Sequence, residues 1–231
     1  MRDQHTPTGV DSRFNEGELV FMLGEELKKP LTVIKALSET DSSQRSIALH
    51  AQKALRTIDN VLLTRQINEN QIQLDLTAVH VGSVLANVSE QLTPLSIEHG
   101  CETEVYIQSN ISSVTADRAI LVSGFESIWH TMIGLTNRPS TLRWSVYRSG
   151  KVIRVALTNN SVDLSKVTLG DSGSVAGSST QPISGLAGPA TDLSIAQQLF
   201  RSLNTQITKV HREGMSGLAV SFEPSTQLSL V

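Results

Sequence analysis

The chain has 231 residues, 39% of them hydrophobic, which is enough for one large domain or two small ones. Its 19 basic and 22 acidic residues give a formal net charge of −3, and without a chain-wide basic field neither nucleic acid nor an anionic membrane is expected as the main partner. The single cysteine, Cys101, cannot form a disulfide within the chain, and no apolar run approaches the roughly 20 residues of a membrane span or forms a signal-peptide core, so a reducing, cytoplasmic location is expected.

The first predicted helix begins near Asn15, after a polar, aperiodic stretch over residues 1–14 that is expected to be a flexible tail. Asn15 and Glu18 have the spacing of a capping box, in which both side chains satisfy backbone donors at a helix start. Apolar residues then recur every three or four positions, at Leu19, Leu23, Leu27, Leu31, Ile34 and Leu37. Since Pro30 removes a helical hydrogen bond within this stripe, packing against other helices must keep the helix intact.

A second helix is predicted after the polar turn at residues 39–44 and ends near Gln66. Its apolar stripe consists of Ile47, Ala51, Leu55, Ile58 and Leu62, widened by Ala54 and Val61. Residues 15–70 are therefore expected to form a helical hairpin. Because two helices alone bury little surface, such a hairpin usually pairs with a second copy in a four-helix bundle, which predicts a homodimer. The alternative is that the hairpin packs on the rest of its own chain.

Residues 71–231 have the pattern of a second domain. Strands are expected at residues 72–76, 102–108, 206–213 and 217–224, and in a hairpin over 141–159 with its turn at Ser149–Gly150. Helices are expected at residues 81–98, 117–135 and 193–203. The Ser- and Gly-rich stretch at 161–190 is too long for a plain connector. Mixed strands with helices on one face predict a two-layer α/β sandwich of the α+β class.

This order of elements resembles the transmitter of sensor histidine kinases, in which a dimerising phosphoacceptor hairpin precedes a Bergerat-type ATP-binding domain. The resemblance covers residues 15–225, and residues 25–31, EELKKPL, are similar to the family motif H-E-L-[KR]-[ST]-P-L. It places Glu25 where the family carries the phosphorylated histidine. Lys29 stands where the family usually has Thr or Asn, a residue associated with dephosphorylating the partner. The resemblance thus implies that the phosphoacceptor is absent.

Residues 117–136 resemble the family helix in which two asparagines hold magnesium and phosphate, and the matching positions carry Ser127 and Thr131. Magnesium requires oxygen ligands at about 2.0–2.1 Å in an octahedral arrangement, and a hydroxyl on a shorter arm replaces an amide oxygen poorly. No metal site is therefore expected.

Residues 153–164, IRVALTNNSVDL, resemble the strand and turn that end in D-x-G-x-G, whose aspartate accepts a hydrogen bond from the adenine amino group. The matching positions are Asn159, Ser161 and Asp163. Asn159 has no charge but retains a carbonyl oxygen for adenine. Asp163 adds bulk and a carboxylate where the family's glycine lets the backbone approach the nucleotide.

Residues 188–200 resemble the second glycine box, G-x-G-L-G-L, in which Ala190 and Asp192 replace two glycines. In the family, backbone donors at this helix start receive phosphate. With Asp192 expected in the first turn, the positive end of the helix already has an anion. A phosphate charge about 4 Å from that carboxylate would cost on the order of 4 kcal/mol at an effective dielectric constant of 20.

Substitution at all four sites within a retained helical frame predicts a catalytically inactive histidine-kinase-like protein. It is expected to bind no cofactor and to act as a homodimeric binding module. The partner implied by the resemblance is a response-regulator receiver domain or an authentic histidine kinase. The expected contact surface is the charged cluster Glu25, Glu26, Lys28 and Lys29 on the first helix.

Three alternatives remain: an ATP-independent histidine phosphotransferase, a regulatory nucleotide-binding domain, and an unrelated α+β protein with coincidental spacing. A phosphotransferase needs a histidine, and His50 is the only histidine of the predicted hairpin. No acid–base partner is recognisable near His50, which favours an ordinary surface histidine. His130 lies near the lost magnesium position, but a lone histidine is not a metal site.

Overall fold

The computed structural model describes residues 27, 28, 30–34, 36, 44–136, 139–165, 167, 169 and 187–225. In chain order the elements are α2 (Gln44–Asn68), β1 (Thr77–Val79), α3 (Val81–Glu98), β2 (Cys101–Ile107), β3 (Val114–Ala116), α4 (Arg118–Leu135), β4 (Ser140–Ser149), β5 (Val152–Asn159), α5 (Ala187–Ser202), β6 (Ile207–Arg212) and β7 (Met215–Phe222). The described residues between 27 and 36 are helical, whereas the expected helix start at Asn15 lies outside the described part. No helix of that part is long and apolar enough to cross a membrane.

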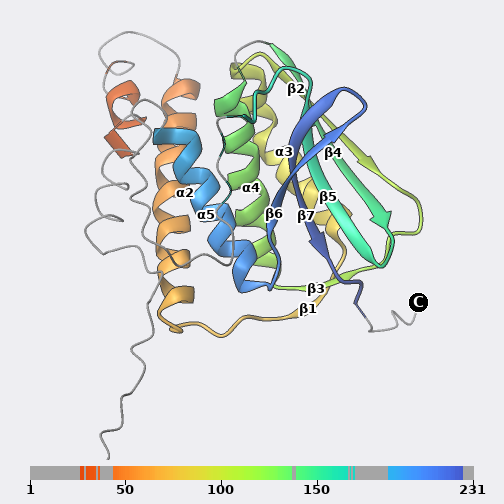
Figure 1. Ribbon diagram of the computed structural model, residues 1–231. Coiled ribbons are helices and arrows are strands. Elements are labelled where there is room, and N and C mark those ends of the chain that lie inside the picture. The colour runs from red at the N-terminus through yellow and green to blue at the C-terminus, as the bar shows by residue number, and fades with distance from the viewer. Residues whose placement is uncertain are drawn as a thin grey trace, which may run out of the picture.

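One five-stranded sheet organises the fold, with the strand order β2-β4-β5-β7-β6. Strand β2 runs parallel to β4, and the other neighbours are antiparallel. Helices α3, α4 and α5 cover one face of this sheet, and no described helix covers the other face (Figure 1). Strands β1 and β3 form a separate two-stranded sheet. The predicted two-layer sandwich of mixed strands with helices on one face is therefore confirmed.

An aromatic core holds the helices on the sheet. Phe125 of α4 contacts Trp144 of β4 and Phe200 of α5, with ring centroids 5.6 and 5.5 Å apart. Phe200 in turn lies 6.1 Å from Phe222 of β7. Helices α4 and α5 approach closely because position 124 is glycine: a Cβ at Gly124 would lie 2.6 Å from the Phe200 ring. This close packing brings together the positions of the candidate site.

Two strand predictions need correction. Residues 72–76 are not a strand, and the strand β1 that follows them has only three residues, held by pairing with β3. A strand of three residues is too short to show an alternation of apolar and polar residues in the sequence. The turn of the β4–β5 hairpin is Gly150–Lys151, because Ser149 pairs with Val152. The residue with a positive φ of +62° in this turn is glycine, for which that conformation is free of strain.

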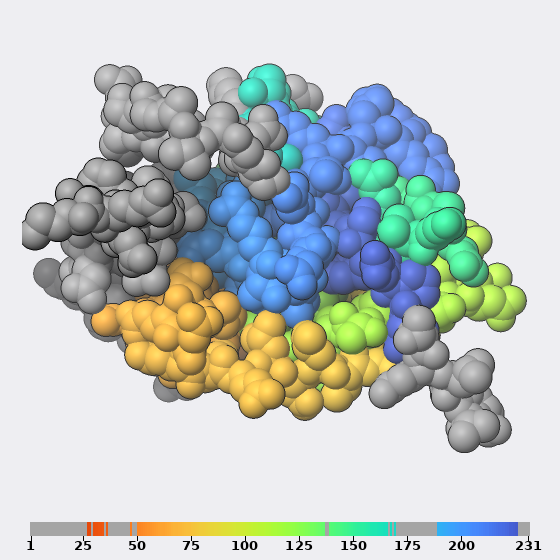
Figure 2. Space-filling view, turned by 60° about the horizontal axis from the view of Figure 1, so that its bottom comes forward, coloured from red at the N-terminus to blue at the C-terminus, as the bar shows by residue number. Residues whose placement is uncertain are grey.

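Helix α2 lies outside the sandwich, against α4 and α5. Small and polar residues of α2 are buried there, namely Ala54, Thr57, Asn60 and Thr64. Figure 2 shows α2 in orange beside α5 in blue. Leu55 and Leu62 belong to a different face of the helix and are 62% and 51% exposed. One face of α2 thus packs on its own chain, as expected for the alternative in which the hairpin packs on the rest of the chain. The face that carries Leu55 and Leu62 is uncovered among the described residues.

Candidate functional site

The two α4 positions that match the metal-binding asparagines lie in the contact between α4, α2 and α5. Ser127 is fully buried, and its Oγ accepts a hydrogen bond from Asn60 Nδ2 of α2 at 3.3 Å. Thr131 is also buried, and its Oγ1 donates to the Ser127 carbonyl oxygen at 2.8 Å. The same hydroxyl lies 3.5 Å from the carbonyl oxygen of Pro189 in α5. Both hydroxyls are therefore engaged within the chain.

The segment that matches the second glycine box is a helical turn packed on α4. Helix α5 begins at Ala187, six residues before the predicted start at residue 193. Pro189 is compatible with this start because it lies in the first turn, where the backbone N–H groups have no partner within the helix. A Cβ at Gly134 of α4 would lie 2.6 Å from Pro189 Cγ, so the two helices meet closely here. Ala190 is exposed. The earlier start corrects one prediction: the first turn of α5 holds no acidic residue, so Asp192 does not act at the helix terminus.

Asp192 instead forms a buried ion pair with Arg56 of α2. Arg56 Nη2 lies 2.9 Å from Asp192 Oδ1, and the side chains are only 13% and 10% exposed. The other Arg56 donors, Nε and Nη1, are buried without a hydrogen-bond partner among the described residues. Burial raises the pKa of the Glu126 carboxyl on α4, and the Arg56 guanidinium opposes this shift. An ion pair with α2 thus occupies the position of Asp192, which the sequence resemblance matches to a glycine of the second glycine box.

The position that matches the adenine-binding aspartate is turned inward. Asn159 is fully buried, and its Nδ2 donates to Ser140 Oγ at 2.7 Å and to the Thr141 carbonyl oxygen at 3.1 Å. Its Oδ1 accepts from the backbone N and the Oγ of Ser161, at 2.7 and 2.8 Å. The expectation that this oxygen stays available for adenine is therefore wrong. Asp163 is exposed and accepts from the Ser165 backbone N at 2.9 Å.

Of the two histidines discussed in the sequence analysis, His50 lies beside a carboxylate and His130 is buried. His50 Nε2 lies 3.5 Å from Glu98 Oε1 at the end of α3, so the expectation of no acidic partner near His50 is wrong. Burial lowers the pKa of His130 well below its usual value, and the charges of Arg56 and Lys53 add to this effect. Among the described residues, no group of three or more His, Cys, Asp or Glu side chains could hold a metal ion.

Most of the predicted partner-binding cluster lies outside the described residues. Glu25, Glu26 and Lys29 lie outside the described residues, and only Lys28 lies within them. Lys28 is exposed on a helical segment, where its carbonyl oxygen accepts a hydrogen bond from Thr32 Oγ1 at 2.6 Å. The surface role of this cluster therefore stays a prediction.

No protein-family model and no curated protein sequence matches the chain, but solved structures do. The Acinetobacter baumannii histidine kinase AdeS matches with a TM-score of 0.58 at 10% identity, over 87% of this chain and 98% of that chain. Full-length ShkA in complex with AMPPNP matches at 0.56 and 14% identity, over 92% of this chain and 47% of that one. The histidine kinase ThkA, solved with the response regulator protein TrrA, matches at 0.51 and 12% identity, over 90% and 62% of the two chains. The chain therefore has the fold of a histidine kinase transmitter with its ATPase-like domain.

Proposed function

We propose that this chain is a catalytically inactive histidine-kinase-like protein that works as a dimeric binding module in two-component signalling. The observation that carries the proposal is the use of its former nucleotide positions for internal bonding. Asn159 is satisfied by its own domain, Ser127 by Asn60 and Asp192 by Arg56. A nucleotide would have to displace each of these contacts.

The cost of that displacement supports inactivity. Magnesium would need ligand oxygens at about 2.0–2.1 Å, yet the Ser127 and Thr131 hydroxyls are buried against α2 and α5. Freeing Asp192 from Arg56 leaves a carboxylate with little exposure and no counter-ion. A phosphate at about 4 Å from it would add repulsion on the order of 4 kcal/mol at an effective dielectric constant of 20.

The exposed leucines of α2 support a dimer. Leu55 and Leu62 are seven residues apart, which places them on one face of the helix, and both are more than half exposed. Leu31, on the described part of the first helix, is 54% exposed. Burying such leucines against a second copy contributes about 1.5–3 kcal/mol for each fully buried side chain. This arrangement suits a bundle in which each hairpin also packs on its own sandwich.

The proposed partner is a response-regulator receiver domain or an authentic histidine kinase. ThkA, which shares this fold, was solved in complex with the response regulator protein TrrA. In our proposal the contact centres on Glu25, Lys28 and Lys29 of the first helix. Glu25 carries a permanent negative charge near the place where a phosphohistidine would carry one.

Calorimetric titration with Mg·ATP tests inactivity, with ShkA as the positive control because its structure holds AMPPNP. We expect no saturable heat from this chain, and binding tighter than about 100 μM, equivalent to more than roughly 5 kcal/mol, would reject the proposal. The Glu25→His variant, incubated with radiolabelled ATP, should remain unlabelled because a restored nucleophile still lacks a bound donor. Label on that variant alone would show that the ATP site is competent.

Partner binding is tested separately by surface immobilisation of the dimer and titration with purified receiver domains from the organism that encodes it. Saturable binding by one of them supports the module, and the Lys28→Glu, Lys29→Glu double variant serves as the interface control. Absence of binding to every receiver domain and histidine kinase of that organism would remove this function.

A further inference from the structure

A groove of about 620 Å³ is lined by side chains of the open face of the sheet, which alternate with the core residues that face the helices. Its floor is made of short side chains in the middle of the sheet, Ser145, Ala156 and Thr158. Larger aromatic, apolar and charged side chains from β2, β4, β6 and the β6–β7 turn form its walls. A volume of this size falls in the range of roughly 300–1,000 Å³ that is typical of small-molecule sites.

The groove exists because the β6–β7 hairpin curls over the sheet. Strand β6 is three places from β4 in the sheet, yet the Arg212 guanidinium lies 4.8 Å from the centre of the Tyr147 ring on β4. Strand β7 can press onto β5 only because position 217 is glycine, since a Cβ at Gly217 would overlap the Leu157 carbonyl oxygen. The hairpin therefore forms a flap over a floor of small residues.

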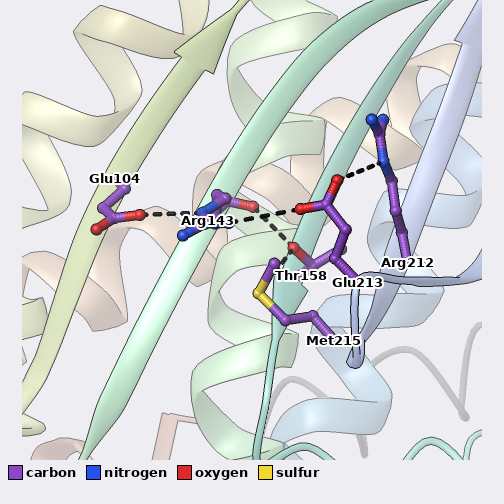
Figure 3. Close-up of polar contacts among 6 residues, drawn as sticks. All are labelled: Glu104, Arg143, Thr158, Arg212, Glu213 and Met215. Carbon is purple, nitrogen blue, oxygen red and sulfur yellow. Dashed lines mark hydrogen bonds and ion pairs between the residues drawn. The ribbon is translucent and has the colours of Figure 1, made fainter.

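Glu213 occupies an unusual place at the tip of this flap. The turn consists of Glu213 and Gly214, with φ values of +53° and +75°, a conformation that favours Asn or Gly at both positions. Glu213 Oε1 lies 3.2 Å from Arg212 Nε, and its Oε2 lies 4.0 Å from Arg143 Nη1 (Figure 3). One carboxylate thus sits between two arginines from opposite walls.

The carboxylate of Glu213 is weakly held. Its side chain is 61% exposed, and exposed ion pairs contribute little because water screens them. Arg143 has a second partner, Glu104, whose Oε2 lies 3.0 Å from Arg143 Nε. When Glu213 turns out to solvent, two guanidinium groups and one carboxylate line the groove, so its lining gains a net positive charge. Guanidinium groups form strong, directed hydrogen bonds to carboxylate, phosphate and sulfonate oxygens.

We propose that this groove binds a small organic anion with an aromatic or apolar body, and that Glu213 is the internal anion that the ligand replaces. The ligand's acidic group takes the place of the Glu213 carboxylate between Arg143 and Arg212. Its body lies against the exposed Tyr106, which is 63% accessible, and Met215. This site is independent of the proposed loss of nucleotide binding, because it lies on the other face of the sheet.

The test is a fluorescence titration of the full chain with two matched probes. One is 8-anilinonaphthalene-1-sulfonate, and the other is N-phenyl-1-naphthylamine, which has the same rings without the acidic group. Glu213→Gln removes the internal anion but keeps the shape of the side chain, and should tighten sulfonate binding about two- to fivefold, the equivalent of one exposed ion pair. Arg143→Ala with Arg212→Ala should weaken it about tenfold or more.

The uncharged probe and one further variant control the experiment. Neither change should alter binding of N-phenyl-1-naphthylamine, and Arg118→Ala, at an exposed arginine at the start of α4, should leave sulfonate binding unchanged. Equal sulfonate affinity in the parent and the double arginine variant, with both folded by circular dichroism, would overturn the proposal. Weaker sulfonate binding by Glu213→Gln would also overturn it, since the carboxylate would then assist the ligand instead of competing with it.

Discussion

Removing either partner of the Arg56–Asp192 ion pair, which joins α2 and α5, should lower the free energy of unfolding of the chain. Removing one partner of a buried pair costs about 3–5 kcal/mol because the other charge stays desolvated. The two side chains retain 13% and 10% exposure, so we expect a loss at or slightly below the lower end of this range, about 2–3 kcal/mol, for Arg56→Ala or Asp192→Ala. For a chain of this length the melting temperature should fall by about 5–10 °C.

Urea and thermal unfolding of the two single variants and the double variant measure this coupling. The double variant should lose about as much as either single variant, which gives a coupling energy of at least about 1.5 kcal/mol. The Glu69→Gln variant, at an exposed pair between Arg65 of α2 and the residue just after that helix, is the control and should cost less than about 0.5 kcal/mol. Additive losses for Arg56→Ala and Asp192→Ala would refute the ion pair, and losses below about 0.5 kcal/mol would refute its burial.

Because two Arg56 donors lack partners, Arg56→Met with Asp192→Leu should restore parental stability or exceed it.

Three further predictions concern pH, assembly and partner binding. The folded state keeps His130 neutral, so below about pH 6.5 the unfolded state binds a proton that the folded state does not. The free energy of unfolding should therefore fall by up to about 1.4 kcal/mol per pH unit toward pH 5.5. In pH-dependent urea melts, His130→Gln should flatten this fall. The raised pKa of Glu126 acts in the opposite direction, and an unchanged slope in the variant would contradict the assignment. Leu55→Glu should convert a dimer to a monomer in light scattering, because a buried charge without a partner costs several kcal/mol. A well-folded monomeric parent at tens of micromolar would exclude this interface. Lys28→Glu with Lys29→Glu should weaken partner binding at least about tenfold with the melting temperature nearly unchanged, and full affinity would move the partner surface elsewhere.

The sequence by itself predicted most of the helices and strands, and it also predicted altered chemistry at the positions that match the family motifs. Periodicity predicted α2, α3 and α4, and alternation predicted β2, β6, β7 and the β4–β5 hairpin, because these patterns reflect which face of an element is buried. The family frame was recognisable because a helical repeat keeps fixed spacings even when the chemical residues change. Ser127, Thr131, Asn159 and Asp192 were therefore predicted, without a structure, to replace the family's nucleotide-site residues.

Only the tertiary structure decided what those residues do instead. Arg56 and Asp192 are 136 residues apart, and no local pattern links them. The small and polar residues Ala54, Thr57, Asn60 and Thr64 recur every three or four positions, a signal for a second buried face of α2 that the neighbouring leucines obscured. The groove depends on the approach of the β6–β7 hairpin to β4, a strand that is not its neighbour in the sheet, which local patterns do not encode. Side-chain periodicity reports burial along one element, whereas the partner that buries it is set by how distant elements pack. That packing places Ser127 and Asp192 in internal contacts with α2.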